Sequence, residues 1–172
     1  MRFIANLWEP NKRIKCNPIP LPNVQHLLLQ LKGFDCASAT DSNVGYCHVL
    51  LDEEASKMCT IVMPWAKHKC LRLPQGLASA PDIFQDEMNN LFHELEFVRC
   101  HIDDLLVTNK GNFRDHLRKL EQVFAKRRAT GLQVNPTKSF WEKPECEHLG
   151  CVTSKNGIKP QPKKAKAILE IS

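Results

Sequence analysis

Residues 97–108 read Phe97-Val98-Arg99-Cys100-His101-Ile102-Asp103-Asp104-Leu105-Leu106-Val107-Thr108, so that two adjacent carboxylates lie between two short apolar runs. Such runs predict strands, and Asp tolerates a turn, so the stretch predicts a β-hairpin with Asp103 and Asp104 at its bend. Adjacent carboxylates repel each other unless they share a cation. Mg²⁺ takes oxygen ligands, usually one or two carboxylates plus substrate phosphates. The hairpin is therefore a candidate metal site. The alternative is that the two acids are ordinary turn residues that bind no metal.

A third acid, Asp41, follows another predicted strand. Residues 34–40 predict a short strand that ends at Asp41, and residues 42–46 predict a tight turn. Two-metal phosphoryl transfer uses carboxylates that hold two cations roughly 3.5–4 Å apart. The three acids meet that need only if the strand that carries Asp41 lies beside the hairpin.

Helices are predicted on both sides of the hairpin in the sequence. Three sets of apolar residues recur at helical spacing: Val24, Leu27, Leu28 and Leu31; Phe84, Met88, Leu91 and Leu95; and Phe113, Leu117, Leu120 and Phe124. Gly33 ends the first helix, Pro81 begins the second, and Asn112 and Gly131 delimit the third. Each set predicts a helix face that is buried in the core.

The remaining segments are strand-like. Residues 59–63 and 69–73 predict a strand pair joined by a hairpin, and a later strand is expected over 147–153, before a turn at 155–157. Residues 161–172 predict the opening of a helix. The order of elements predicts an α+β fold with an antiparallel sheet and helices packed on one face.

Composition limits the class of protein. The chain has 172 residues and a formal net charge of +5, a mild basic bias that fits a polyanionic partner. No 18 apolar residues run together and the N-terminus has no signal-peptide core, so an intracellular protein without membrane contact is expected. Eight cysteines without a C-x-x-C pair do not favour disulfides. A zinc site at Cys146, His148 and Cys151 is an alternative that lacks an obvious fourth ligand.

Six motifs follow one another along the chain: Arg2 through Pro22, Asp41-x-x-x-Gly45-Tyr46, Leu73-Pro74-Gln75-Gly76-Leu77 with Ala80-Pro81-x-x-Phe84-Gln85, His101-Ile102-Asp103-Asp104, Gly131-Leu132-x-Val134-Asn135-Pro136-x-Lys138, and His148-Leu149-Gly150 with Gly157-Ile158. In this order they resemble the palm and part of the fingers of reverse transcriptases, most closely those of gypsy-type LTR retrotransposons and related retroviral Pol proteins. His101 stands where the family has a tyrosine, and Trp8 where it has a basic residue.

The resemblance implies a right-hand polymerase palm with partial fingers and without a thumb. Residues 1–33 would be a fingers segment, 34–160 the palm with an inserted fingers hairpin at about 58–75, and 161–172 the start of a truncated thumb connection. The implied function is that of an RNA-directed DNA polymerase core, with two-metal nucleotidyl transfer from a dNTP to a primer 3′-hydroxyl. The alternatives are a weak or inactive relic that at most binds nucleic acid, and a DNA-templated polymerase.

The resemblance also implies roles for particular residues. Asp41 and Asp103, supported by Asp104, would hold two Mg²⁺ or Mn²⁺ ions, and Lys138 would protonate the leaving pyrophosphate. The ring of Tyr46 would exclude a 2′-hydroxyl and so select deoxynucleotides. Further contacts to nucleotide and template are implied for Arg2, Val44, Gly45, Gln75, Gly76 and Ile102, and a primer grip for His148, Leu149 and Gly150.

The implied partners are an RNA or DNA template, a DNA primer, a dNTP, and the thumb and RNase H regions of a Pol polyprotein. The implied location is the cytoplasm, including retroelement particles, or the nucleus.

Overall fold

The computed structural model of the chain describes residues 5–15, 33–43 and 45–162. Several predictions fall outside the described residues. They are the helix over 24–31, the helix opening beyond residue 162, and the nucleotide contacts of Arg2 and Val44.

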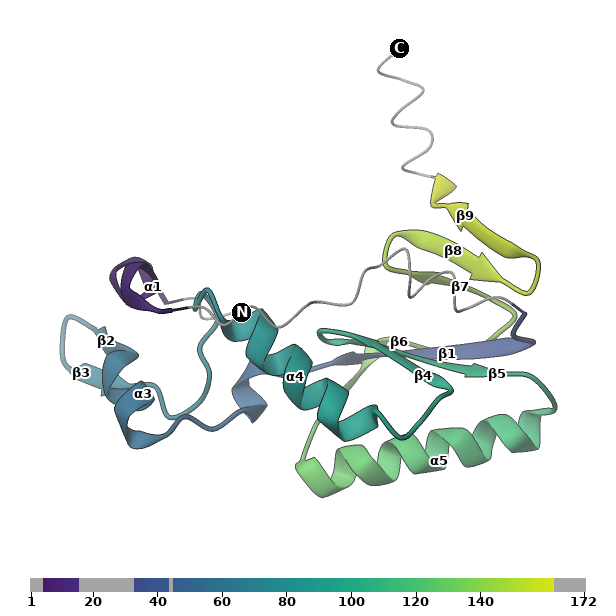
Figure 1. The fold of residues 1–172 in the computed structure, drawn as a ribbon, viewed down its shortest axis with the longest axis horizontal. Helices are drawn as coiled ribbons and strands as arrows, with labels where there is room; N and C mark the ends of the chain where they lie inside the picture. The colour runs from purple at the N-terminus through teal and green to yellow at the C-terminus, as the bar shows by residue number, and fades with distance from the viewer. Residues whose placement is uncertain (1–4, 16–32, 44, 163–172) are drawn as a thin grey trace, which may run out of the picture.

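A four-stranded antiparallel sheet forms the centre of the molecule (Figure 1). Its strands are β1 (Cys36–Ser42), β4 (Val98–His101), β5 (Asp104–Asn109) and β6 (Val134–Lys143), in the order β4-β5-β1-β6. The predicted hairpin is confirmed, because β4 and β5 pair with only Ile102 and Asp103 between them. The strand that carries Asp41 lies directly beside this hairpin, as the three-acid hypothesis requires.

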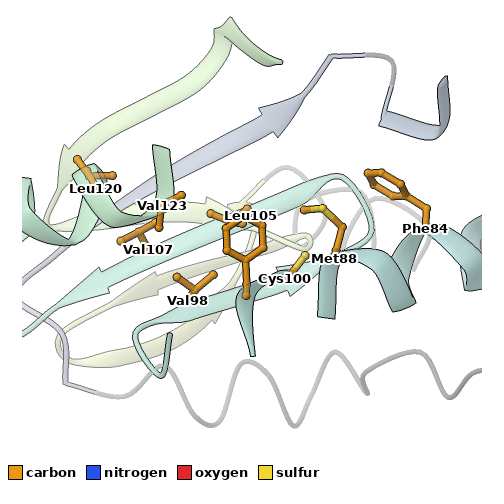
Figure 2. Packing of buried hydrophobic residues seen from close by; sticks show 9 residues of the cluster. Phe84, Met88, Val98, Cys100, Leu105, Val107, Leu120 and Val123 are labelled. Atoms are coloured by element: carbon orange, nitrogen blue, oxygen red, sulfur yellow. The ribbon is translucent and has the colours of Figure 1, made fainter. Parts of the chain in front are cut away.

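Helices α4 (Ala80–Phe92) and α5 (Phe113–Thr130) pack on one face of this sheet (Figure 1). Figure 2 shows the side chains that fill this core, which come from both helices and from β4 and β5. Successive residues of a strand point to opposite faces, so Leu105 and Val107 contact the helices while Leu106 packs on the other side. The predicted arrangement, an antiparallel sheet with helices on one face, is confirmed.

A second sheet packs against the opposite face. It consists of β7 (Glu145–His148), β8 (Cys151–Ser154) and β9 (Gly157–Pro160), and its Cys146 joins a buried cluster with Phe34, Ala37 and Leu106. The single strand predicted over 147–153 is therefore wrong. The chain reverses within it at Leu149 and Gly150, which both have positive φ angles, 50° and 78°.

The predicted buried stripe of α5 is only partly correct. Asn112 caps the helix by accepting a hydrogen bond from the Asp115 amide at 2.9 Å, and Gly131 ends it with φ 74°, both as predicted. However, Phe113 is 52% exposed and Leu117 is 42% exposed. The face that is buried carries His116, Leu120, Val123 and Arg127 instead. The helix is rotated relative to the prediction because polar side chains of β1 pair with His116 and Arg127.

A smaller lobe lies at the other end of the molecule (Figure 1). It contains α1 (Trp8–Arg13), α3 (Glu53–Met58), β2 (Thr60–Val62) and β3 (Lys67–Lys69). The strand predicted over 69–73 begins two residues earlier and ends at Lys69. The lobe has its own apolar cluster of Ala5, Leu7, Cys59, Leu73, Leu77 and Ala80. Its assignment to a fingers subdomain, like the other domain boundaries, stays a prediction.

None of the helices in the described part of the chain is long and apolar enough to span a membrane.

Candidate active site

Strand pairing brings the three acids together. Asp41, near the end of β1, lies directly opposite Asp104, the first residue of β5. Directly opposite residues of antiparallel strands project from the same face. The bend that carries Asp103 is tied to β1 as well, because the Ser42 amide donates to the Asp103 carbonyl oxygen at 3.1 Å. Asp41 and Asp104 are 63 residues apart in sequence, and the register of the two strands makes them neighbours.

Lys138 and the clustered acids set the electrostatics of the site. The Lys138 Nζ atom, on β6, lies 3.0 Å from the Asp41 Oδ2 atom. Burial, followed by the negative charges of Asp103 and Asp41, raises the pKa of Asp104 above its ordinary value, while His101 and Lys138 oppose that shift. A cation bound beside these carboxylates would favour their ionised form and so lower the pKa again.

Asp41 and Asp103, but not Asp104, line a pocket of about 710 Å³. Its other polar lining residues include Lys138, Asn135, Gln75 and Arg72. A pocket of this volume falls in the range of small-molecule and cofactor sites. Its lining combines two carboxylates with two basic side chains, Lys138 and Arg72.

Tyr46 lines the same pocket and is held from behind by Phe84. It lies on the short 3₁₀ helix η1 (Gly45–His48), and its ring meets the Phe84 ring edge-on at a centroid distance of 5.4 Å. A Cβ atom at Gly45 would lie 2.8 Å from the Phe84 ring, so no larger residue fits there without a shift. Burial and the nearby Asp103 charge raise the pKa of the Tyr46 hydroxyl. Tyr46 is therefore a neutral, well-packed wall of the pocket.

Other predicted site residues lie outside the pocket lining. Gly76 (φ 107°) shapes the loop after Gln75, and its carbonyl accepts a hydrogen bond from the Asn11 side chain at 2.9 Å. Ile102 lies at the hairpin bend, where its amide is bound by Gln85.

The predicted primer-grip residues form the β7–β8 turn. Leu149 and Gly150 are half-buried there, but His148 is only 4% exposed. Burial, with a smaller effect of His101, lowers the pKa of His148 to about 4. A contact between His148 and a primer would therefore require this hairpin to rearrange.

Within the described ranges, no three Asp, Glu, His or Cys side chains are close enough to form a ready-made metal site. This is true of Asp41, Asp103 and Asp104 as well as of Cys146, His148 and Cys151, so the two candidate sites differ only in the chemistry of their donors. That chemistry does not favour the zinc hypothesis. Zinc binds thiolate, but burial raises the pKa of the Cys146 thiol, whose Sγ atom lies 3.1 Å from Thr153 Oγ1.

The acid cluster differs from the zinc candidate, because its donors are carboxylates that carry unbalanced negative charge. Asp41 already holds one cationic group, the Lys138 ammonium. Oxygen donors of this kind suit Mg²⁺ or Mn²⁺, so the residues present fit such an ion.

Sequence reasoning missed several residues that shape the site. Arg72 lines the pocket and donates to the Cys47 carbonyl oxygen at 3.0 Å. Gln85 and Arg127 are fully buried beside the strands that carry the acids. Gln85 stands in the motif Ala80-Pro81-x-x-Phe84-Gln85, but no role of its own was predicted for it.

The sequence is similar to known proteins over most of its length. Residues 3–153 match the sequence model of the family described as "Reverse transcriptase (RNA-dependent DNA polymerase)". The retrovirus-related Pol polyprotein from transposon 297 of Drosophila melanogaster is 30% identical over 152 residues, covering 87% of this chain and 14% of the polyprotein. The polyprotein from transposon gypsy of the same organism is 27% identical over 171 residues, covering 98% and 16%.

Solved structures show the same fold. The foamy viral protease-reverse transcriptase in complex with double-stranded DNA matches with a TM-score of 0.92 at 20% identity, over 99% of this chain and 30% of that one. The same enzyme in complex with an RNA/DNA hybrid matches with a TM-score of 0.87 at 20% identity, over 97% and 23%. The predicted α+β polymerase fold is thus confirmed. The chain spans less than a third of the matched chain in each of these four comparisons.

Proposed function

The chain belongs to the reverse transcriptase (RNA-dependent DNA polymerase) family, and we propose that it holds a polymerase site. There, the 3′-hydroxyl of a primer attacks the α-phosphate of a deoxynucleoside triphosphate, and pyrophosphate leaves. The observation that carries this proposal is the register pair of Asp41 and Asp104, with Asp103 at the adjoining bend and in the wall of the pocket.

Asp41 and Asp103, supported by Asp104, would hold two Mg²⁺ or Mn²⁺ ions. Such ions, when bound, lower the pKa of the attacking hydroxyl and neutralise charge on the leaving pyrophosphate. Burial and, after it, the negative charges of Asp103 and Asp41 raise the pKa of Asp104, and a bound cation would offset the part that comes from those charges. Lys138 balances part of that charge at Asp41, and we assign it proton donation to the leaving pyrophosphate.

The pocket walls suit a deoxynucleoside triphosphate. Tyr46 offers a flat, rigid surface on which a ribose 2′-hydroxyl would collide. Gln75 and Gly45 also line the pocket, and we assign Gln75 a contact with the base or the template and the Gly45 amide a contact with a phosphate. Arg72 lines the pocket, and its guanidinium group can pair with phosphate oxygens.

Nucleic acid is the proposed partner. Foamy viral protease-reverse transcriptase, which shares this fold, has been solved with double-stranded DNA and with an RNA/DNA hybrid. The net charge of +5 also favours a polyanion. We propose that this chain binds a DNA primer annealed to an RNA template, with further regions of a Pol polyprotein completing the grip.

Primer extension tests the proposal. The chain is incubated with an RNA template, an annealed DNA primer, dNTPs and either Mg²⁺ or Mn²⁺. Wild type is expected to extend the primer. Asp103→Asn should lower the rate by at least about a hundredfold, because a metal-binding charge stabilises the transition state by several kcal/mol.

The matched control is Asp86→Asn, which changes an exposed acid on α4 outside the pocket and should leave the rate unchanged. Salt-dependent binding of primer–template with no incorporation by the wild type would contradict the proposal and favour a protein that only binds nucleic acid.

A further inference from the structure

Gln85 connects helix α4 to the hairpin that carries the acids. Its side chain is completely buried. Its Oε1 atom accepts a hydrogen bond from the Ile102 amide at 2.6 Å, and its Nε2 atom donates to Asn89 Oδ1 at 2.8 Å. The same Nε2 atom lies 3.5 Å from the Cys100 carbonyl oxygen. One carboxamide thus touches the main chain on both sides of His101.

The backbone at Ile102 needs this support. Its φ angle is 54°, in the left-handed region that β-branched residues rarely adopt. Ile102 lies between the paired strands, so no ladder hydrogen bond uses its amide. Ile102 is partly buried, and an amide withdrawn from water without a partner is costly. Gln85 supplies that partner from one side of the bend, while the Ser42 amide binds the Asp103 carbonyl oxygen on the other.

We propose that Gln85 is a positioning residue for the acid site. It holds Ile102 in the left-handed conformation and thereby fixes the direction in which the next residue, Asp103, enters the pocket. The role of Asp103 rests on the proposed polymerase function, but the hold of Gln85 on the bend does not. A merely structural role would place Gln85 among ordinary core residues whose loss lowers stability without a specific effect at the bend.

The test uses Gln85→Met, which keeps the length and bulk of the side chain and removes the acceptor. Hydrogen exchange of the Ile102 amide, followed by NMR on the full chain, is the readout that does not depend on activity. The exchange rate at Ile102 should rise at least about tenfold relative to core amides of α5. Gln85→Glu retains an acceptor oxygen and should keep the Ile102 rate within about threefold of wild type.

Val123→Ala is the matched control, because Val123 is fully buried in the same core but on α5, away from the bend. It should lower Tm without a selective change at Ile102. In primer extension, Gln85→Met should lower kcat at least about tenfold and change KM for the dNTP less than threefold, since the pocket lining is intact. Val123→Ala should change neither.

The proposal would be overturned if the Ile102 amide stayed as protected in Gln85→Met as in wild type. It would also be overturned if Val123→Ala, compared at the same Tm, raised the Ile102 exchange rate as much as Gln85→Met does. If Gln85→Met does not fold, Asn89→Ala removes the partner of Nε2 and should raise Ile102 exchange two- to threefold. No change there would also overturn it. If the wild type extends no primer, the polymerase proposal fails while the exchange measurement still decides the role of Gln85.

Discussion

The two faces of strand β1 carry different chemistry on alternating residues. One face presents Asp41 to the pocket, where its carboxylate meets Lys138. The opposite face presents Ser38 and Ser42 to helix α5, where Ser38 Oγ lies 2.7 Å from His116 Nε2, and Arg127 Nη2 donates to Ser42 Oγ at 3.2 Å. At Asp41 the first face is open and charged, whereas the second face is closed and polar at both serines.

The difference separates function from folding within a single strand. Groups on the pocket face keep charge without full compensation, which costs stability and leaves them available to a cation and a substrate. Groups on the α5 face pair with each other inside the core and contact nothing from solution. Changes on the pocket face should therefore affect activity with little effect on stability, and changes on the α5 face should leave activity unchanged.

The largest expected effect lies on the pocket face. Asp41→Asn should lower primer extension at least about a hundredfold, because it removes one of the charges proposed to hold metal. Its unfolding free energy should change by less than about 1 kcal/mol, since the ion pair with half-exposed Lys138 contributes little. Urea denaturation and primer extension on the same sample check both. A large loss of stability with retained activity would invert the comparison.

The next effect is a loss of stability in acid. The pKa of His148 is about 4 in the folded chain against 6.5 for the free side chain, because burial disfavours the charged ring. The unfolded chain therefore binds more protons between these values, so stability is full above pH 6.5 and falls progressively down to pH 4. The total loss is about 3 kcal/mol, at about 1.4 kcal/mol for each pH unit.

Urea denaturation at pH 7.5 and pH 4.5 measures this loss. Burial also lowers the pKa of His116, so part of the slope should survive in His148→Leu. His68→Gln, at an exposed histidine of β3, is the control and should behave as wild type. An acid loss in His148→Leu as large as that of wild type would show that the buried ring is not responsible.

Two apolar residues of α5, Val123 and Phe113, should differ in how much stability their replacement by alanine costs. Val123→Ala should cost about 1–3 kcal/mol because it opens a cavity in the core. Phe113→Ala should cost less than about 1 kcal/mol although it removes more atoms, because the ring is half exposed. Equal costs in urea denaturation would mean that α5 packs as the apolar spacing predicts.

The smallest change in stability is expected for Arg127→Met. Arg127 is only 1% exposed, and in the described part of the chain its Nε and Nη1 atoms have no hydrogen-bond partner. Burial lowers its pKa. A buried charge with few partners is often replaced by an apolar side chain of similar volume at no cost, so the unfolding free energy should stay within about 1 kcal/mol. A loss above about 3 kcal/mol would show that the guanidinium is essential to the α5 face.

The sequence allowed prediction of the pocket face but not of the α5 face. The hairpin at Asp103 and Asp104, the strand that ends near Asp41, and the capped start and end of α5 follow from local signals of spacing, turn residues and caps. The pairing of Asp41 with Asp104 is a matter of register, which only the motif order of the family indicated.

The apolar spacing of α5 failed for a physical reason. Apolar residues at positions 113 and 117 predicted the buried face, but β1 presents serine hydroxyls there. These hydroxyls are satisfied by His116 and Arg127, so the helix buries polar residues that no apolar pattern marks. The role of Gln85 was not predicted either, although its motif was recognised, because its partner is the main chain of a distant bend.

Mn²⁺ titration of the isotope-labelled full chain, followed by NMR line broadening, tests the meeting of the three acids most directly. At substoichiometric Mn²⁺, the amide signals of Asp41, Gly45 and Asp103 should broaden first, while signals at the start of α5, near His116, persist. Asp41→Asn combined with Asp103→Asn should remove this pattern. Broadening centred elsewhere, such as on exposed Glu53 and Glu54 of α3, with Asp41 and Asp103 unaffected, would contradict the account.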